Sequence, residues 1–122
     1  MKILGIDDNE DLLSLCEIAL SSEGHEYTGI NNAREGLQAI RDKKFDVVLL
    51  DLAMPEFSGS DVIDALVKEG IIKKQKLVIF TATSPTKKEI EEFLVKGAHS
   101  ILKKPVDPDE LSKFVNKLES ER

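Results

Sequence analysis

The stretch Val47-Val48-Leu49-Leu50-Asp51 places four apolar residues directly before a carboxylate. It is apolar at consecutive rather than alternate positions, as expected of a strand that is covered by helices on both faces. We therefore expect residues 46–50 to form the central strand of a parallel sheet. Asp51 would then lie at the carboxyl edge of that sheet, where open α/β folds bind their ligands.

Three further apolar segments run into polar residues in the same way: residues 3–6 before Asp7 and Asp8, residues 77–80 before Thr81, and residues 100–102 before Lys103 and Lys104. If these segments are parallel strands of one sheet, all of the polar groups meet at its carboxyl edge. Carboxylates, a hydroxyl and an ammonium group would then converge on one pocket. Such a set suits an anion that is held beside a metal ion.

Helical patterns separate the strands. Apolar residues recur at three- and four-residue spacing in five segments, which begin near Asn9, Asn31-Asn32, Ser58, Thr86, and Asp107 or Asp109. Each of these residues is of a type that caps helices. Residues 25–30 resemble a further short strand, which we expect at the edge of the sheet. The alternation predicts an α/β fold of doubly wound (βα)5 type, a flavodoxin-like three-layer sandwich with parallel strand order 2-1-3-4-5.

The same patterns predict the surroundings of individual side chains. They place Leu15, Val67 and Leu94 on the inner faces of their helices. We expect His25 and His99 to be surface or half-buried residues that neither bind a metal nor become phosphorylated.

Composition narrows the classes of function. The chain has 122 residues, and we expect residues 1–122 to form a single domain. Its formal net charge of −6 argues against direct nucleic-acid binding, which needs a basic surface. Cys16 is the only cysteine, so no intrachain disulfide can form, and we expect it to be a packed core thiol. The apolar run at residues 1–6 is neither a signal peptide nor a membrane span, so we expect a cytoplasmic protein without membrane insertion.

Asp7, Asp8 and Asp51 in one pocket would raise one another's pKa unless they shared a cation. Ligation by oxygen atoms alone predicts Mg²⁺, with Mn²⁺ as a substitute, rather than zinc. A carboxylate beside such an ion can attack a phosphoryl group and form an aspartyl phosphate. The Lys104 ammonium and the Thr81 hydroxyl would then contact the phosphoryl oxygens. Each residue alone is explained as a helix cap or a surface residue, but their occurrence at four strand ends favours a functional site.

Lys104-Pro105 follows the last predicted strand. An X-Pro bond is cis more often than other peptide bonds, and a cis bond would turn the lysine back over the edge of the sheet. We predict a cis bond here.

The chain resembles the receiver domain of two-component response regulators, chemotaxis regulators included, at five motifs: Asp7-Asp8, Asp51 with residues 52–55 and Gly59, Thr81-Ala82, Gly97-Ala98 and Lys104-Pro105. The resemblance implies that Asp51 accepts a phosphoryl group from a sensor histidine kinase or a phosphotransfer protein. It also implies that Asp7, Asp8, Asp51 and the backbone carbonyl of Ala53 hold Mg²⁺. Such a protein is a phosphoacceptor signalling domain rather than an enzyme.

By the same resemblance, phosphorylation draws Thr81 toward the phosphoryl group and repacks the face made by the fourth helix, fifth strand and fifth helix, where a downstream protein binds. Many receivers carry Tyr or Phe where this chain has Ile101, so the inward swing of an aromatic ring is not expected here. Ala53 and Thr83 match positions that, in the family, tune the access of water to the phosphoryl group.

Three alternatives accompany this interpretation. The chain is either a stand-alone or phosphorelay regulator, which we prefer, or a receiver domain cut from a longer regulator such as a transcription factor. A phosphohydrolase that turns over through an aspartyl phosphate would need a second acid two residues after the nucleophile, where this chain has Ala53. A flavodoxin-like electron carrier would need a phosphate-binding loop after the first strand, and residues 7–11 are instead acidic.

Overall fold

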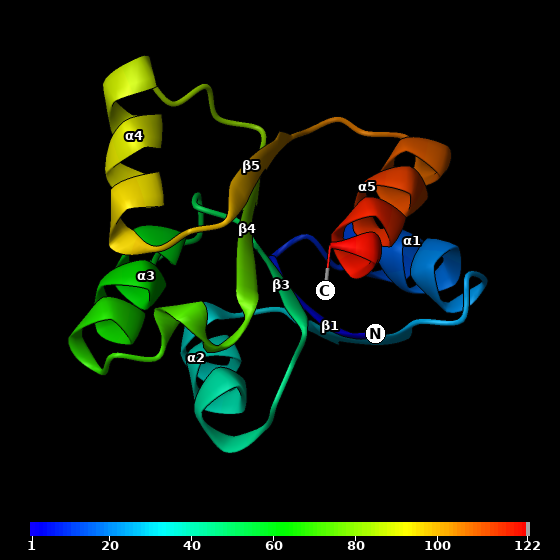
Figure 1. Ribbon diagram of the computed structural model, residues 1–122, viewed down its shortest axis with the longest axis horizontal. Coiled ribbons are helices and arrows are strands. Elements are labelled where there is room, and N and C mark those ends of the chain that lie inside the picture. Colours follow the sequence, from blue (N-terminus) through cyan, green and yellow to red (C-terminus); the bar gives the residue numbers. More distant parts are fainter. Residues whose placement is uncertain (122) are drawn as a thin grey trace.

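The computed structural model, which describes residues 1–121, alternates strands and helices along the chain (Figure 1). The strands are β1 (Lys2–Ile6), β2 (Glu26–Ile30), β3 (Val47–Leu50), β4 (Lys76–Thr81) and β5 (Ser100–Lys103). The helices are α1 (Glu10–Ser21), α2 (Ala33–Asp42), α3 (Gly59–Lys68), α4 (Lys87–Lys96) and α5 (Pro108–Ser120). A short 3-10 helix, η1 (Ile72–Lys74), precedes β4 and was not predicted.

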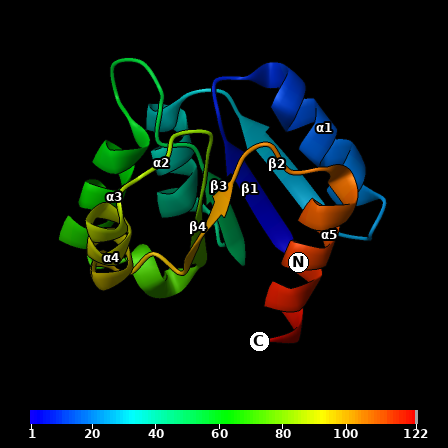
Figure 2. The ribbon, with the colours of Figure 1, turned by 90° about the horizontal axis from the view of Figure 1, so that it is seen from above.

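The strands form one parallel sheet in the order β2-β1-β3-β4-β5, which confirms the predicted doubly wound topology. As predicted, β3 is the central strand and β2 lies at an edge. Helices α1 and α5 cover one face of the sheet, and α2, α3 and α4 lie on the other (Figures 1 and 2). Because the strands are parallel, their carboxyl ends all meet at one edge.

The core explains why the central strand is apolar at every position. Alternate side chains of a strand point to opposite faces of the sheet. Val48 and Leu50 belong to the apolar cluster beneath α2 and α3, whereas Val47 and Leu49 belong to the cluster beneath α1 and α5. The second cluster also contains Cys16, which is 3% exposed and is therefore a packed core thiol, as predicted.

The helices begin where the capping residues predicted. The caps are Asn9, Asn32, Ser58, Thr86 and Asp107, and the side chain of each accepts a hydrogen bond from a backbone amide in the first turn of its helix. Ser58 and Thr86 also form reciprocal capping boxes with Asp61 and Glu89. These local bonds position the helices behind the loops that carry the site.

The structure corrects several predicted burials. Leu15, Val67 and Leu94 are 43%, 41% and 43% exposed, although their spacing places them on the apolar stripes of their helices. Conversely, His25 is only 6% exposed: its ring lies between the amino-terminal nitrogen, 3.1 Å from Nδ1, and Asn116 Oδ1, 2.9 Å from Nε2. This contact with α5 is not visible in the local sequence. His99 is exposed, as predicted.

Helix α4 is the least embedded of the helices. The structure describes every residue of α4, and none of them is buried. Ile90 and Phe93 are half-buried. The predicted inward face of this helix therefore makes only partial contact with the sheet. Within residues 1–121, no helix combines the length and the hydropathy that a membrane span requires.

Candidate functional site

Every side chain predicted for the site lies at the carboxyl edge of the sheet. Ile6 of β1 is paired with Leu50 of β3, so the two strands end level with each other. The amide of Asp51 continues this pairing and donates to the Ile6 carbonyl at 3.0 Å. Asp7, which follows Ile6, therefore lies beside Asp51. Lys104 continues the pairing of β5 with β4, because its amide donates to the Thr81 carbonyl at 2.9 Å.

One pocket joins most of these residues. Its lining includes Asp7, Asp8, Asp51, Ala53 and Lys104. Thr81 is fully buried beneath the pocket and lines an adjacent hollow under α4 instead. The structure thus brings together the predicted site residues that come from four separate strand ends.

The three carboxylates are close enough to share one cation. Asp7, Asp8 and Asp51 each offer an oxygen, and these oxygens all lie within 4.8 Å of one another. Asp7 and Asp51 are each 5% exposed, whereas Asp8 is exposed to solvent. A set of donors made only of carboxylate oxygens, with one side open to water, fits a hard divalent ion such as Mg²⁺.

Lys104 is the positive charge of the pocket. Its ammonium group forms an ion pair with Asp7 and lies 3.7 Å from Asp51 Oδ1. The ammonium nitrogen is also 5.3 Å from the centre of the Phe80 ring, and the side chain is only 15% exposed. The Lys104-Pro105 bond is cis, as predicted. A lysine held in this way neutralises part of the charge of two buried carboxylates.

The pKa of Asp51 is raised above its ordinary value. Burial, which penalises the charged form, is the largest cause, and the negative charge of Asp7 adds to it. The Lys104 ammonium, the Ala53 amide and the Thr81 hydroxyl act in the opposite direction and lower the pKa. Asp51 is therefore a carboxylate that is held in a partly unfavourable charged state and that would gain from an added cation.

Backbone groups shape the pocket as well. The Asn9 amide donates to Asp7 Oδ1 at 2.9 Å and orients that carboxylate. A Cβ added to Gly59, at the start of α3, would lie 2.2 Å from the Asp51 carbonyl oxygen, so only glycine allows this approach. The role of the Asn9 amide was not predicted from the sequence, since Asn9 was seen only as a helix cap.

Thr81 has a partner that the sequence analysis missed. Its Oγ1 atom lies 3.0 Å from Thr83 Oγ1 and accepts a hydrogen bond from the Thr83 amide at 3.3 Å. The signal that could have found this pair is the Thr-x-Thr spacing directly at the end of a strand, where a hydroxyl bonds the backbone two residues on.

Two apolar surfaces border the site. On α1, Leu15 and Ile18 are 43% and 71% exposed, and Leu15 also lines the pocket. On the other side, the hollow under α4 is lined by Thr81 together with half-buried Ile101.

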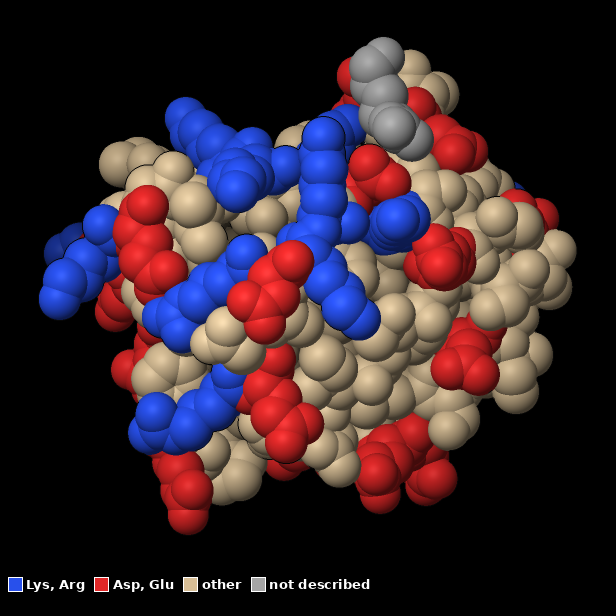
Figure 3. Space-filling view, turned by 90° about the horizontal axis from the view of Figure 1, so that it is seen from below, with Lys and Arg blue, Asp and Glu red and all other residues tan. Residues whose placement is uncertain are grey.

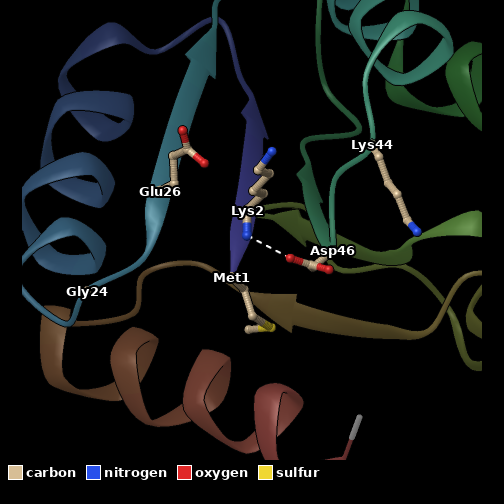
Figure 4. A pocket seen from close by; sticks show the side chains of 6 residues that line it. All are labelled: Met1, Lys2, Gly24, Glu26, Lys44 and Asp46. Carbon is tan, nitrogen blue, oxygen red and sulfur yellow. Dashed lines mark hydrogen bonds between the residues drawn. The ribbon is translucent and has the colours of Figure 1, made fainter.

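The opposite edge of the sheet has a different character. Figure 3 views the molecule from this side, where Lys and Arg side chains gather over part of the surface. A hollow here is lined by Met1, Lys2, Gly24, Glu26, Lys44 and Asp46 (Figure 4). The Lys2 amide donates to Asp46 Oδ2 at 2.8 Å. The lysines and carboxylates of this hollow lie side by side. None of the predicted site residues lines it.

Comparison with known proteins agrees with the geometry. Residues 3–116 match the family model of the response regulator receiver domain. Among curated proteins, the response regulator SaeR of Staphylococcus aureus (strain USA300) is 30% identical over 119 residues, which are 95% of this chain and 49% of that protein. The chain thus spans about half the length of the curated relatives it matches.

Solved structures with the same fold include chains that this protein covers almost completely. The Francisella response regulator 1452 receiver domain has a TM-score of 0.85 and 27% identity, with 98% of this chain and 97% of that chain covered. The response regulator TrrA of Thermotoga maritima, in complex with Mg²⁺-BeF, has a TM-score of 0.80 and 29% identity, with 96% and 97% covered. The chemotaxis protein CheY4 of Vibrio cholerae has a TM-score of 0.83 and 26% identity, with 96% and 97% covered.

Proposed function

Because the chain belongs to the family of response regulator receiver domains, we propose that it is a Mg²⁺-dependent phosphoacceptor in which Asp51 receives the phosphoryl group. The observation that carries this proposal is the cluster of three carboxylates, whose oxygens lie within 4.8 Å of one another. The Lys104 ammonium beside them is 3.7 Å from Asp51. Receiver domains are phosphoacceptor signalling modules rather than enzymes, so the product is the modified protein itself.

The proposed reaction transfers a phosphoryl group from the phosphohistidine of a histidine kinase or a phosphotransfer protein. An Asp51 carboxylate oxygen attacks phosphorus, the P–O bond forms, the P–N bond breaks, and the imidazole leaves with the electron pair. Mg²⁺, or Mn²⁺ in its place, would be held by Asp7, Asp8, Asp51 and the Ala53 carbonyl, and would neutralise charge on the phosphoryl group. Lys104 and Thr81 contribute an ammonium and a hydroxyl donor to the phosphoryl oxygens.

The position of Lys104 supports this division of roles. In the structure its ammonium group pairs with Asp7, and it need move only a short way to reach a group attached to Asp51. An ammonium in this place stabilises negative charge that builds up on the transferred group, and its effect is strong because the Lys104 side chain is only 15% exposed.

The surfaces beside the pocket suggest where partners bind. We propose that the phosphodonor packs against Leu15 and Ile18 of α1, which are exposed apolar residues, and of which Leu15 lines the pocket. We propose that a downstream protein reads the face formed by α4, β5 and α5. The hollow under α4 supports this, because Ile101 of β5 lines it together with Thr81, the residue at the carboxyl end of β4.

We further propose that residues 1–122 form a single receiver domain of the cytoplasm that acts alone or in a phosphorelay. The alternative is that they are the receiver portion of a longer regulator, a form that the roughly twofold greater length of SaeR illustrates. A phosphohydrolase is disfavoured because Ala53, which lies at the pocket two residues after Asp51, offers no acid for a leaving group.

Intact-mass measurement after incubation with acetyl phosphate tests the proposal. We expect one phosphoryl adduct that requires Mg²⁺ and that is absent from Asp51→Asn. Asp64→Asn, which removes an exposed carboxylate of α3, is the matched control and should retain the adduct. An adduct that persists in Asp51→Asn, or that forms equally well in EDTA, would contradict the assignment.

A further inference from the structure

The hollow under α4 is large enough to hold a small molecule. Its volume of 530 Å³ lies within the range of ligand sites in other proteins. Apolar walls come from Ile90 and Leu94 of α4 and from Ile101 of β5. Leu94 is 43% exposed, and Ile90 and Ile101 are half-buried, so part of their apolar surface is open to a ligand.

The remaining lining is polar and carries no negative charge. Ser84, Ser100 and Lys103 line the hollow, and Lys103 is exposed at the end of β5. Among the described residues that line the hollow none is Asp or Glu, although the chain contains 23 of these. Within residues 1–121, Lys103 forms no ion pair, whereas the adjacent Lys104 pairs with Asp7. The hollow is therefore locally positive in a protein of net charge −6.

This charge distinguishes the hollow from the acidic pocket. An anion that approaches the acidic pocket meets Asp7, Asp8 and Asp51, and the ammonium group beside them is already paired. An anion that enters the hollow meets no carboxylate in its lining. His99, which also lines the hollow, lies 3.6 Å from Glu121 Oε2, but Glu121 is outside the lining. Without a metal ion, an anion is therefore favoured in the hollow and disfavoured in the acidic pocket.

We propose that the hollow under α4 binds a small aromatic carboxylate, with its ring against the apolar walls and its carboxylate group beside Lys103. Apolar walls with a few polar groups that fix orientation are the usual composition of small-molecule sites. Pro85 and His99, which both line the hollow, have ring side chains against which a planar ligand packs well. This binding needs neither Asp51 nor a metal ion, so it goes beyond the proposed function and does not rest on it.

Titration with benzoate in EDTA, followed by NMR of the backbone amides, tests the site. We expect millimolar affinity, because the ligand has few atoms, and the largest shifts in α4 and β5. Benzyl alcohol keeps the ring and lacks the charge, whereas cyclohexanecarboxylate keeps the charge and lacks the flat ring. Each should bind about fivefold more weakly than benzoate. Absence of saturable shifts, equal binding of either analogue, or largest shifts at the acidic pocket would overturn the proposal.

Two substitutions locate the ligand. Ile101→Phe should fill the hollow and weaken the binding of benzoate and of benzyl alcohol about tenfold. Lys103→Met should weaken benzoate about fivefold and leave benzyl alcohol unchanged, and because Lys103 is exposed this variant is safe for folding. Lys88→Met, which removes an exposed ammonium group of α4 outside the lining, is the matched control and should bind benzoate as the wild type does.

Two results with these variants would contradict the site. An equal loss of benzoate affinity in Lys88→Met would mean a general effect of charge on the anion. Undiminished binding of benzoate to Ile101→Phe would place the ligand outside the hollow. Either result would overturn the proposal, whether or not Asp51 is phosphorylated by acetyl phosphate.

Discussion

Asp51 is a buried carboxylate whose charged state is only partly compensated. Its raised pKa means that the folded protein holds a proton on this group more readily than the unfolded chain does. The group therefore favours folding most below the ordinary pKa of an aspartate, and this contribution is lost as the pH rises through the raised pKa.

Asp51→Asn should accordingly stabilise the metal-free protein at neutral pH, because it removes the cost of a buried charge. In EDTA at pH 7 we expect a higher midpoint of thermal unfolding than in wild type, and the difference should shrink as the pH falls toward about 4. Circular dichroism melts across this range measure it. Equal midpoints at pH 7, or a difference that grows on acidification, would show that Lys104 and Thr81 already compensate the charge fully.

The Lys104 ammonium lies beside Asp7 and Asp51, the same two carboxylates that would bind a divalent cation. Its ammonium pairs with Asp7 and lies 3.7 Å from Asp51, so it competes electrostatically with a divalent ion. We expect Lys104→Met to bind Mg²⁺ several-fold more tightly, on the order of 1 kcal/mol in an environment of intermediate dielectric, yet to be phosphorylated at least tenfold more slowly. Calorimetric titration and intact mass measure the two effects. Lys103→Met, which removes the exposed neighbouring ammonium, is the control, and an equal effect there would indicate a general change of charge.

At the scale of the element, helices α3 and α4 have the same type of cap but differ in how many of their side chains are buried. Both begin with a capping box, but α3 buries Val62, Ile63 and Leu66, whereas none of the residues of α4 is buried. A helix with few buried contacts depends more on its own local bonds and opens locally at low free energy.

We therefore expect loss of the capping side chain to have different effects in the two helices. Thr86→Ala should weaken α4 by about 1 kcal/mol and appear mainly as faster amide exchange within α4. Ser58→Ala should lower the global free energy of unfolding by a similar amount, without selective exchange in α3. Hydrogen exchange combined with urea unfolding distinguishes the two. Slow, uniform exchange in the α4 of Thr86→Ala would show that this helix is held by its tertiary contacts.

Gly36 shows packing overriding the preference of a helix. An alanine within a helix is favoured over glycine by about 1 kcal/mol. In α2, however, a Cβ at this position would lie 2.5 Å from the Cδ1 atom of buried Ile6. We expect Gly36→Ala to lower the free energy of unfolding by about 1–3 kcal/mol, because overpacking outweighs the gain in helix propensity. Urea unfolding measures this, and combination with Ile6→Val should recover part of the loss; a stabilised single variant would disprove the clash.

Sequence and structure agree closely on the elements, because their signals are local. Each helix start could be predicted since a capping side chain bonds an amide only a few residues away. The exposure of Leu94 could not, because it depends on how far α4 lies from a sheet whose last strand is distant in the chain. The burial of His25 could not be predicted either, because its hydrogen-bond partner Asn116 comes from α5, which is distant in the chain.

At the scale of the whole molecule, the parallel sheet gathers negative charge at one edge, and a bound divalent ion would relieve it. An ion that binds only the folded state stabilises it by about 3 kcal/mol at 100 times its dissociation constant. We expect the unfolding midpoint to rise steadily with Mg²⁺ concentration, and to rise much less in Asp8→Asn, whose exposed side chain makes that variant safe for folding. Melts in NaCl of matched ionic strength are the control. A similar rise in NaCl would mean general screening of charge rather than a site.

The sequence by itself determined the topology and which residues meet at the carboxyl edge, since consecutive apolar positions mark buried parallel strands and parallel strands must end together. The family resemblance carried by the same residues agrees with the match over residues 3–116. Only the tertiary structure decided the state of that edge: the pairing of Lys104 with Asp7, the raised pKa of Asp51 and the contact of Thr83 with Thr81. These depend on distances and on the exclusion of water, which arise when separate loops are brought together and which no single stretch of sequence encodes.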